Sequence, residues 1–159
     1  MKYLPIYLND HYAGSTLGVE LAKRAAKNNN GNAEFGPALA TLASEIDEDR
    51  DALKRIMDRL DVSEDRIKAS IFWLGEKAGR LKPNGELLQF SPLSRVVELE
   101  GLITGISGKR ELWVALLEVA PTEPRLDAAL LERLRDRAEE QRETVEDLRV
   151  KAAREAFAT

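Results

Sequence analysis

One acidic residue occupies a position that a packed helix normally gives to an apolar side chain. Between residues 39 and 60, apolar residues recur at alternating intervals of three and four, and Asp49 takes one place in that series. The series is Leu39, Leu42, Ile46, Asp49, Leu53, Ile56 and Leu60. A buried carboxylate costs free energy unless it is ion-paired, hydrogen-bonded or metal-bound. The partners of Asp49 therefore decide what chemistry this part of the chain can do.

Other polar residues fall near the centres of the long helices that the sequence predicts. In a bundle with simple register these centres share one height, which predicts a buried polar layer. Its expected members are Glu20, Glu45, Asp49, Lys109, Arg110 and Gln141. One interpretation is a salt-bridge network in which Lys109 or Arg110 pairs with Asp49 and Gln141 holds the pair, a device that can fix helix register. The alternative is that Asp49 lies at the edge of this apolar series and reaches water.

The carboxylates of this region could instead hold a metal ion. Ferritin-like carboxylate proteins use a Glu from each of two helices and Glu-x-x-His from each of the other two. The single histidine, His11, has Leu8 where that motif requires Glu, so neither motif can be completed. A carboxylate-only site would favour Mn²⁺ or Mg²⁺, and Lys109 and Arg110 would compete with the ion. The candidate ligands are Glu20, Glu45, Asp49, Glu98, Glu100 and Glu140.

Catalytic motifs give no further support for an enzyme. The sequence contains no Gly-x-Ser-x-Gly, no Walker loop and no His-Glu-x-x-His. His11 stands beside Asp10 and Tyr12 in an early helical turn, where packing or hydrogen bonding is the ordinary role. As a ligand or general base it would need a partner that the sequence does not place. We therefore expect no catalytic residue and no cofactor.

A second pattern consists of small residues at helical spacing. Gly101, Gly105 and Gly108 form Gly-x-x-x-Gly-x-x-Gly, and no strand precedes them. Such spacing in a soluble helix favours close helix contact over phosphate binding. A small-molecule pocket between the helices is the further alternative, and it rests on these residues alone. The matching surface would be made by Ser15, Gly18 and Ala22.

Composition narrows the class of protein. The chain has 159 residues, is 43% hydrophobic and 33% charged, and carries a net charge of −4 with no basic stripe, which argues against a nucleic-acid partner. It contains no cysteine, which excludes disulfides, thiol catalysis and cysteine–zinc sites. The first residues lack the apolar run of a signal peptide, and residues 93–120 carry too many charges for a membrane span. We expect a cytoplasmic protein with no membrane partner.

Helical periodicity predicts an all-α chain forming a single domain over residues 1–159. Helices are expected at 5–27, 35–60, 63–81, 92–120 and from 126 almost to the C-terminus, with Ser91 as a cap and Pro92 in a first turn. Short loops make the first and last pairs antiparallel hairpins, and the shorter middle helix then lies in a crossover. This is a ferritin-like four-helix bundle of two hairpins. A five-helix up-down bundle is the near alternative.

Four segments carry a resemblance that spans nearly the whole chain. They read LNDHYAGSTLGVELAKRAA, EIDEDRDALKRIM, SPLSRVVELEGLITGISGKRELW and AEEQRETVEDLR. On these segments the chain resembles a group of uncharacterised actinobacterial helical proteins that are loosely ferritin-like. The resemblance implies the fold more than any activity. The missing histidines depart from the metal-binding ferritin-like families.

The function expected from these observations is that of a non-catalytic soluble bundle acting through protein interaction, with a homodimer as one form. The alternative is a ferritin-like, carboxylate-rich metal protein in redox or storage. Small-molecule binding between helices is a second alternative. Aromatic and apolar residues provide the candidate contact surfaces, with a place in the ordinary core as the equal alternative, and these are Tyr3, Ile6, Tyr7, Phe72 and Trp73.

Overall fold

The structure is a computed structural model in which residues 1–64 and 90–158 are described. Its elements are α1 (Leu4–Asn28), α2 (Gly36–Arg59), α4 (Pro92–Val119), the 3-10 turn η2 (Ala120–Thr122) and α5 (Ala128–Phe157). None of the described residues lies in a strand, so the all-α prediction is confirmed for them. The expected helix over 63–81, together with Phe72 and Trp73, falls almost wholly outside the described residues.

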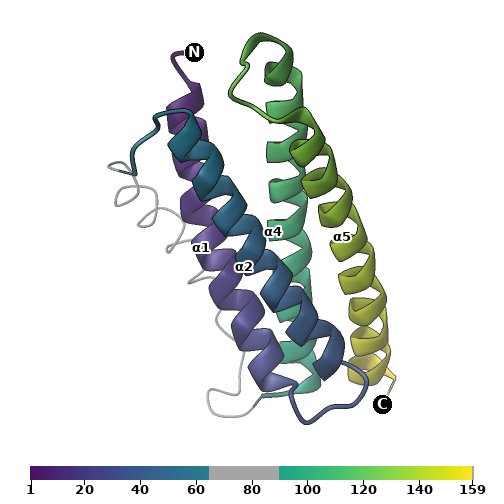
Figure 1. The fold of residues 1–159 in the computed structure, drawn as a ribbon. Helices are drawn as coiled ribbons and strands as arrows, with labels where there is room; N and C mark the ends of the chain where they lie inside the picture. The colour runs from purple at the N-terminus through teal and green to yellow at the C-terminus, as the bar shows by residue number, and fades with distance from the viewer. Residues whose placement is uncertain (65–89, 159) are drawn as a thin grey trace.

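The four helices form an elongated bundle (Figure 1). In this view α1 runs downward and α2 returns upward, while α4 runs upward and α5 returns downward. Helix α4 packs most extensively on α5, and α1 packs on both α2 and α4, whereas α2 and α5 meet at few places. The described helices are therefore two antiparallel hairpins, α1–α2 and α4–α5, that lie against each other mainly through α1 and α4.

An asparagine-rich turn ends α1 and starts α2. Asn29 is buried, and its side-chain amide donates to the Ala25 carbonyl at 2.8 Å. The Asn32 side chain accepts hydrogen bonds from the backbone N–H groups of Glu34 and Phe35. These bonds satisfy backbone groups that a helix end leaves unpaired. Gly36 follows where the chain passes close to itself, because a Cβ there would lie 2.7 Å from the Asn29 carbonyl oxygen.

Helix α4 begins with the cap that the sequence predicts. The Ser91 hydroxyl accepts from the Ser94 backbone N–H at 3.2 Å, and the Ser94 hydroxyl accepts from the Ser91 N–H at 3.3 Å. Pro92 occupies the first turn, where its missing N–H costs nothing. Helix α5 begins at Ala128, two residues later than expected, with Asp127 as its cap.

The core follows the 3–4 spacing of the apolar residues on all four helices. On α2 the whole series from Leu39 to Leu60 is buried, Asp49 included. Among the described residues, Trp113 on α4 and Phe35 before α2 are the largest fully buried side chains. Burial of apolar area at roughly 25 cal/mol per Å² supplies the main favourable free energy of such a bundle. None of the described helices carries an apolar stretch long enough to cross a bilayer.

The turn between α4 and α5 is held by a charged pair. The Arg125 guanidinium donates to Glu123 from both Nε and Nη2, each at 2.8 Å, and the Arg125 backbone N–H donates at 3.2 Å. These hydrogen bonds, the side-chain ones first, lower the pKa of Glu123 from 4.5 to about 2. Arg125 also pairs with Asp61 at the end of α2, at 3.1 Å.

This pair predicts a pH dependence of stability in acid. The folded chain holds the pKa of Glu123 below its unfolded value, so the contribution is complete above about pH 4.5 and is lost as pH falls toward 2. Replacing Arg125→Gln should reduce the slope of unfolding free energy against pH in that range, measured by urea unfolding. Arg135→Gln, which removes a surface pair with Asp136, is the matched control. Equal slopes in wild type and Arg125→Gln would contradict the assignment.

Candidate functional site

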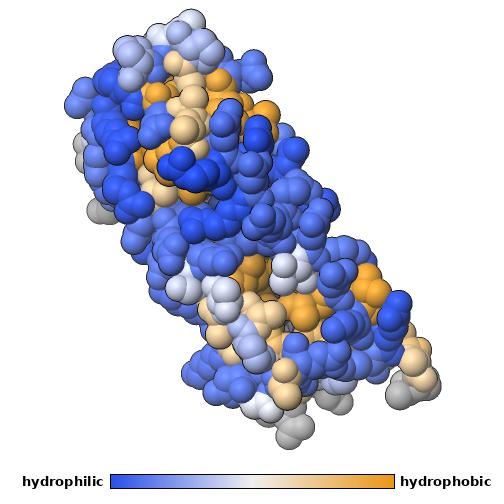
Figure 2. Space-filling view, turned by 45° about the vertical axis from the view of Figure 1, so that its right-hand side comes forward, coloured by the Kyte–Doolittle hydropathy of each residue, from blue (hydrophilic) through white to orange (hydrophobic). Residues whose placement is uncertain are grey.

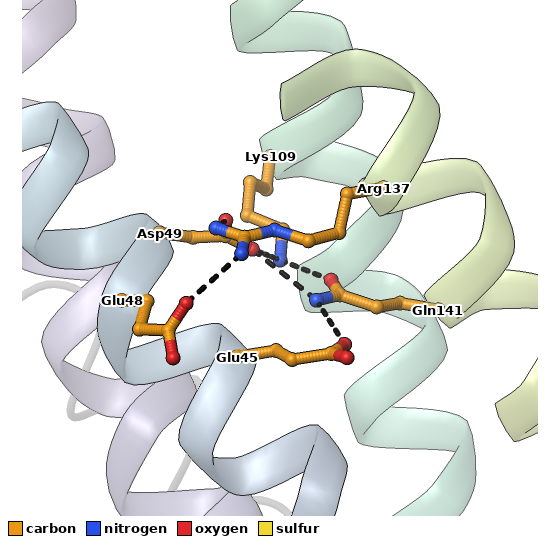
Figure 3. Close-up of polar contacts among 6 residues, drawn as sticks. All are labelled: Glu45, Glu48, Asp49, Lys109, Arg137 and Gln141. Carbon is orange, nitrogen blue, oxygen red and sulfur yellow. Dashed lines mark hydrogen bonds and ion pairs between the residues drawn. The ribbon is translucent and has the colours of Figure 1, made fainter. Parts of the chain in front are cut away.

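The Asp49 carboxylate is the centre of a polar layer inside the bundle (Figure 3). It lies in the middle of α2, and 1% of its side chain is exposed. Its burial follows from the helical spacing, because its neighbours in the apolar series of α2, Ile46 and Leu53, are buried on the same face. A charge in this position requires partners that replace its hydration.

Both carboxylate oxygens of Asp49 have cationic partners, one from each helix of the other hairpin. Oδ2 accepts from the Lys109 ammonium on α4, and Oδ1 accepts from the Arg137 guanidinium on α5. The Gln141 amide nitrogen also approaches Oδ2, at 3.4 Å. The buried acid is thus ion-paired and hydrogen-bonded by side chains of its own chain.

Gln141 joins two parts of the layer. It is buried on α5, one helical turn after Arg137, and its Oε1 accepts from the Lys109 ammonium at 2.5 Å. Its Nε2 donates to the Glu45 carboxylate on α2 at 2.9 Å. A side-chain amide can do both because it carries an acceptor and two donors. Gln141 therefore links the lysine on α4 to a second acid on α2.

The layer reaches solvent through Arg137. Its Nη1 donates to the Glu48 carboxylate at 3.0 Å, and the exposed fraction rises from 1% at Asp49 to 30% at Arg137 and 63% at Glu48. Sequence reasoning missed both Arg137 and Glu48. The available signal was the position of Arg137, four residues before Gln141 and so one turn away on the same face of α5.

Burial and pairing act against each other on the two cations. Burial is the largest effect on Lys109 and lowers its pKa, against the opposing attraction of the Asp49 carboxylate. Burial also acts to lower the pKa of Arg137, but the Asp49 and Glu48 carboxylates outweigh it, so that pKa lies above its ordinary value. Arg137 thus stays cationic, which fits the guanidinium as the partner for a buried carboxylate.

Three expected members of the region lie elsewhere. Glu20 and Glu140 are exposed, so Glu20 is not part of a buried layer. Arg110 faces away from Asp49 and pairs with Glu111 at 2.6 Å and with Glu139 at 2.7 Å. The choice between the two cations of α4 is therefore resolved in favour of Lys109. The reason is rotation about the helix: successive residues differ by about 100° in direction, so neighbours cannot both face the core.

The remaining candidate carboxylates lie apart from the layer. Glu98 on α4 accepts from Arg24 at 3.1 Å and from Asn28 at 2.9 Å, both on α1. Burial raises the pKa of Glu98, and these two partners oppose that shift. Glu100 is exposed. Within residues 1–64 and 90–158, no three His, Asp or Glu side chains come together as a metal site requires.

His11 and the glycines have ordinary surroundings. The His11 ring meets the Tyr7 ring edge-on, with 4.5 Å between centroids, and burial lowers the His11 pKa while Asp10 opposes it. Among the described residues, the close helix contact expected at Gly18, Gly105 and Gly108 is wrong, because a Cβ built at any of the three meets none of their atoms within 4 Å. The same expectation for Gly101 stays a prediction.

The arrangement supports a structural network more directly than a reaction. General acid–base catalysis requires a group within reach of a substrate proton, whereas both oxygens of Asp49 face chain cations in the interior. The sequence matches no protein-family model, and comparisons with curated proteins and with solved structures give no significant match.

The layer predicts unequal effects for the two neighbouring cations of α4. Removing one partner of a buried ion pair costs about 3–5 kcal/mol, and Lys109→Ala should fall near the lower end because Arg137 still pairs with Asp49. Arg110→Ala, the matched control, should leave stability nearly unchanged because its pairs are at the surface. Urea unfolding of both variants measures the difference. Equal losses would contradict the assignment of Lys109 to the layer.

Proposed function

We propose that this chain is a non-catalytic helical bundle that acts through protein interaction. We also propose that the polar layer of Glu45, Asp49, Lys109, Arg137 and Gln141, called the ionic layer from here on, is structural. The observation that carries the proposal is the closure of the layer. The buried acid has a lysine on one oxygen and an arginine on the other, and Glu45 is held by Gln141. A carboxylate already neutralised in this way offers little to a metal ion or a substrate.

The proposed contact surface lies at the start of α1. Tyr3, the residue that precedes α1, is 71% exposed, and Ile6 in the first turn of that helix is 40% exposed. Single exposed apolar residues are common, but neighbouring ones mark contact surfaces more often. The proposed partner is a second copy of this chain. In a two-fold dimer the same patch of each copy covers the patch of the other.

We also propose the ferritin-like connectivity for this bundle. The directions of the described helices support it, since α2 ends at one end of the bundle and α4 begins at the other (Figure 1). Two hairpins whose second and third long helices run parallel have the order of a bundle with one long crossover.

The dimer predicts a specific loss of association. The double variant Tyr3→Ser/Ile6→Ser should shift the wild-type dimer to monomer, because it removes the apolar area that the two copies share. Light scattering coupled to size-exclusion chromatography measures the mass. The matched control is Leu93→Ser/Phe157→Ser, which changes two exposed apolar residues at other positions. A monomeric wild type at high micromolar concentration, or equal shifts in both double variants, would contradict this surface.

The structural role of the layer predicts indifference to metal. Purified protein should contain no stoichiometric Fe, Mn or Zn by elemental analysis, and added Mn²⁺ or Mg²⁺ should leave its unfolding midpoint unchanged, because ligand binding to the folded state would raise it. Stoichiometric metal that disappears in Glu45→Gln or Asp49→Asn would overturn the structural role in favour of a carboxylate metal site. Glu140→Gln, an exposed carboxylate outside the layer, is the control.

A further inference from the structure

The side of the bundle where α2 faces α5 is packed differently from the others. Among the described helices, α4 packs closely on α5 and α1 packs on α2 and α4, whereas α2 and α5 make few backbone approaches. With α5 brought forward, a hydrophilic band crosses the molecule between two regions where apolar side chains reach the surface (Figure 2). We name the line between α2 and α5 the seam.

Charged pairs connect the two sides of the seam at three heights. Near one end Lys151 pairs with Glu34 at 3.1 Å, and near the other Arg125 pairs with Asp61 at 3.1 Å. The side chains of both pairs are about half exposed or more, so each contributes little to stability. The ionic layer lies between them and contains the buried pairs. It is therefore the strongest polar connection across the seam.

The contacts of the layer mostly run between the hairpins. Asp49 pairs with Lys109 and Arg137, and α2 is further joined to α5 by the bonds from Arg137 to Glu48 and from Gln141 to Glu45. The bond from Lys109 to Gln141 stays within the second hairpin. Separating α2 from α5 would thus break the ion pairs of Asp49 while leaving each hairpin intact.

We propose that the ionic layer is a latch, and that the two hairpins part along the seam between α2 and α5 while α1 and α4 stay packed as the hinge. Opening exposes the apolar side chains above and below the layer, and closing requires Asp49 to regain both cations. The latch is conformational and goes beyond the proposed dimer, because the hinge motion concerns one copy of the chain and Tyr3 and Ile6 take no part in it.

Spin labels at two introduced cysteines measure the motion, and the absence of native cysteine makes the labelling specific. The seam pair is Asp51→Cys on α2 with Asp136→Cys on α5, two positions whose side chains are 60% and 62% exposed. The control pair is Glu111→Cys with Asp136→Cys, within the α4–α5 hairpin. Pulsed electron spin resonance gives the distance distribution for each pair in the full chain.

Latch variants should change one distribution and not the other. Arg137→Gln removes a cation while keeping donors, and Asp49→Asn removes the buried charge, so two independent substitutions test the same connection. In each, the seam pair should gain a population longer by about 10 Å, the width of one helix, while the control pair stays unchanged. Arg142→Gln, which removes an ion pair with Glu139 inside α5, should alter neither distribution.

Two results would overturn the latch. One is a seam distribution that stays at its wild-type value in both latch variants, which would mean that apolar packing alone holds the hairpins together. The other is an equal broadening of the seam pair and the control pair in Arg137→Gln, which would mean general loosening rather than hinge motion. Lengthening confined to the seam pair in either folded latch variant supports the proposal.

Discussion

The need to neutralise one buried carboxylate governs how the helices of this bundle fit together. Asp49 lies on the buried apolar face of α2, where an unpaired charge would be strongly unfavourable. Its two oxygens take cations from α4 and from α5, so both helices must present the right residue at the same height. Sliding α4 by one turn would place Gly105 or Trp113 where Lys109 now meets the acid. The ion pairs thus select one register among the alternatives that apolar packing alone would allow.

The same register continues along the rest of the seam. Glu34 pairs with Lys151 toward one end, Asp49 with Arg137 in the middle, and Asp61 with Arg125 toward the other end. The steady antiparallel order of these pairs indicates that α2 and α5 keep one alignment over their length. The exposed end pairs contribute little by themselves. They agree with the alignment that the buried pair requires.

The sequence predicts those members of the layer that lie on the apolar face of their helix. The 3–4 spacing placed Asp49 and Gln141 correctly, because burial on a helix follows directly from its period. The same spacing leaves Lys109 and Arg110 as alternatives, since the centre of the apolar face of α4 passes between them. A small rotation of the helix decides which of the two faces inward. Side-chain burial in the folded chain separates the two, with Lys109 at 14% exposed and Arg110 at 36%.

The errors concern the face of a helix and the reach of a side chain. Glu20 lies near the centre of its helix, but the buried stripe of α1 runs through Val19, Ala22 and Ala25, and Glu20 stands outside that stripe and is exposed. The spacing does not predict Arg137, because this residue lies beside the apolar face of α5 and not on it. Its side chain is long enough to reach Asp49 from there, with its aliphatic part at the edge of the core and the guanidinium against the carboxylate.

The position of Arg137 also explains why a charged layer here differs from a sealed core. A fully buried ion pair is often no more stabilising than apolar residues of the same size, because desolvation offsets the attraction. Asp49 is fully desolvated, but Arg137 keeps part of its surface in water and shares its charge with the exposed Glu48. The acid is therefore neutralised by a cation that has lost only part of its hydration. The layer joins α2 to α5, whose backbones approach each other closely at few places, so charge helps to hold the alignment of two helices that lie further apart than the helices within each hairpin.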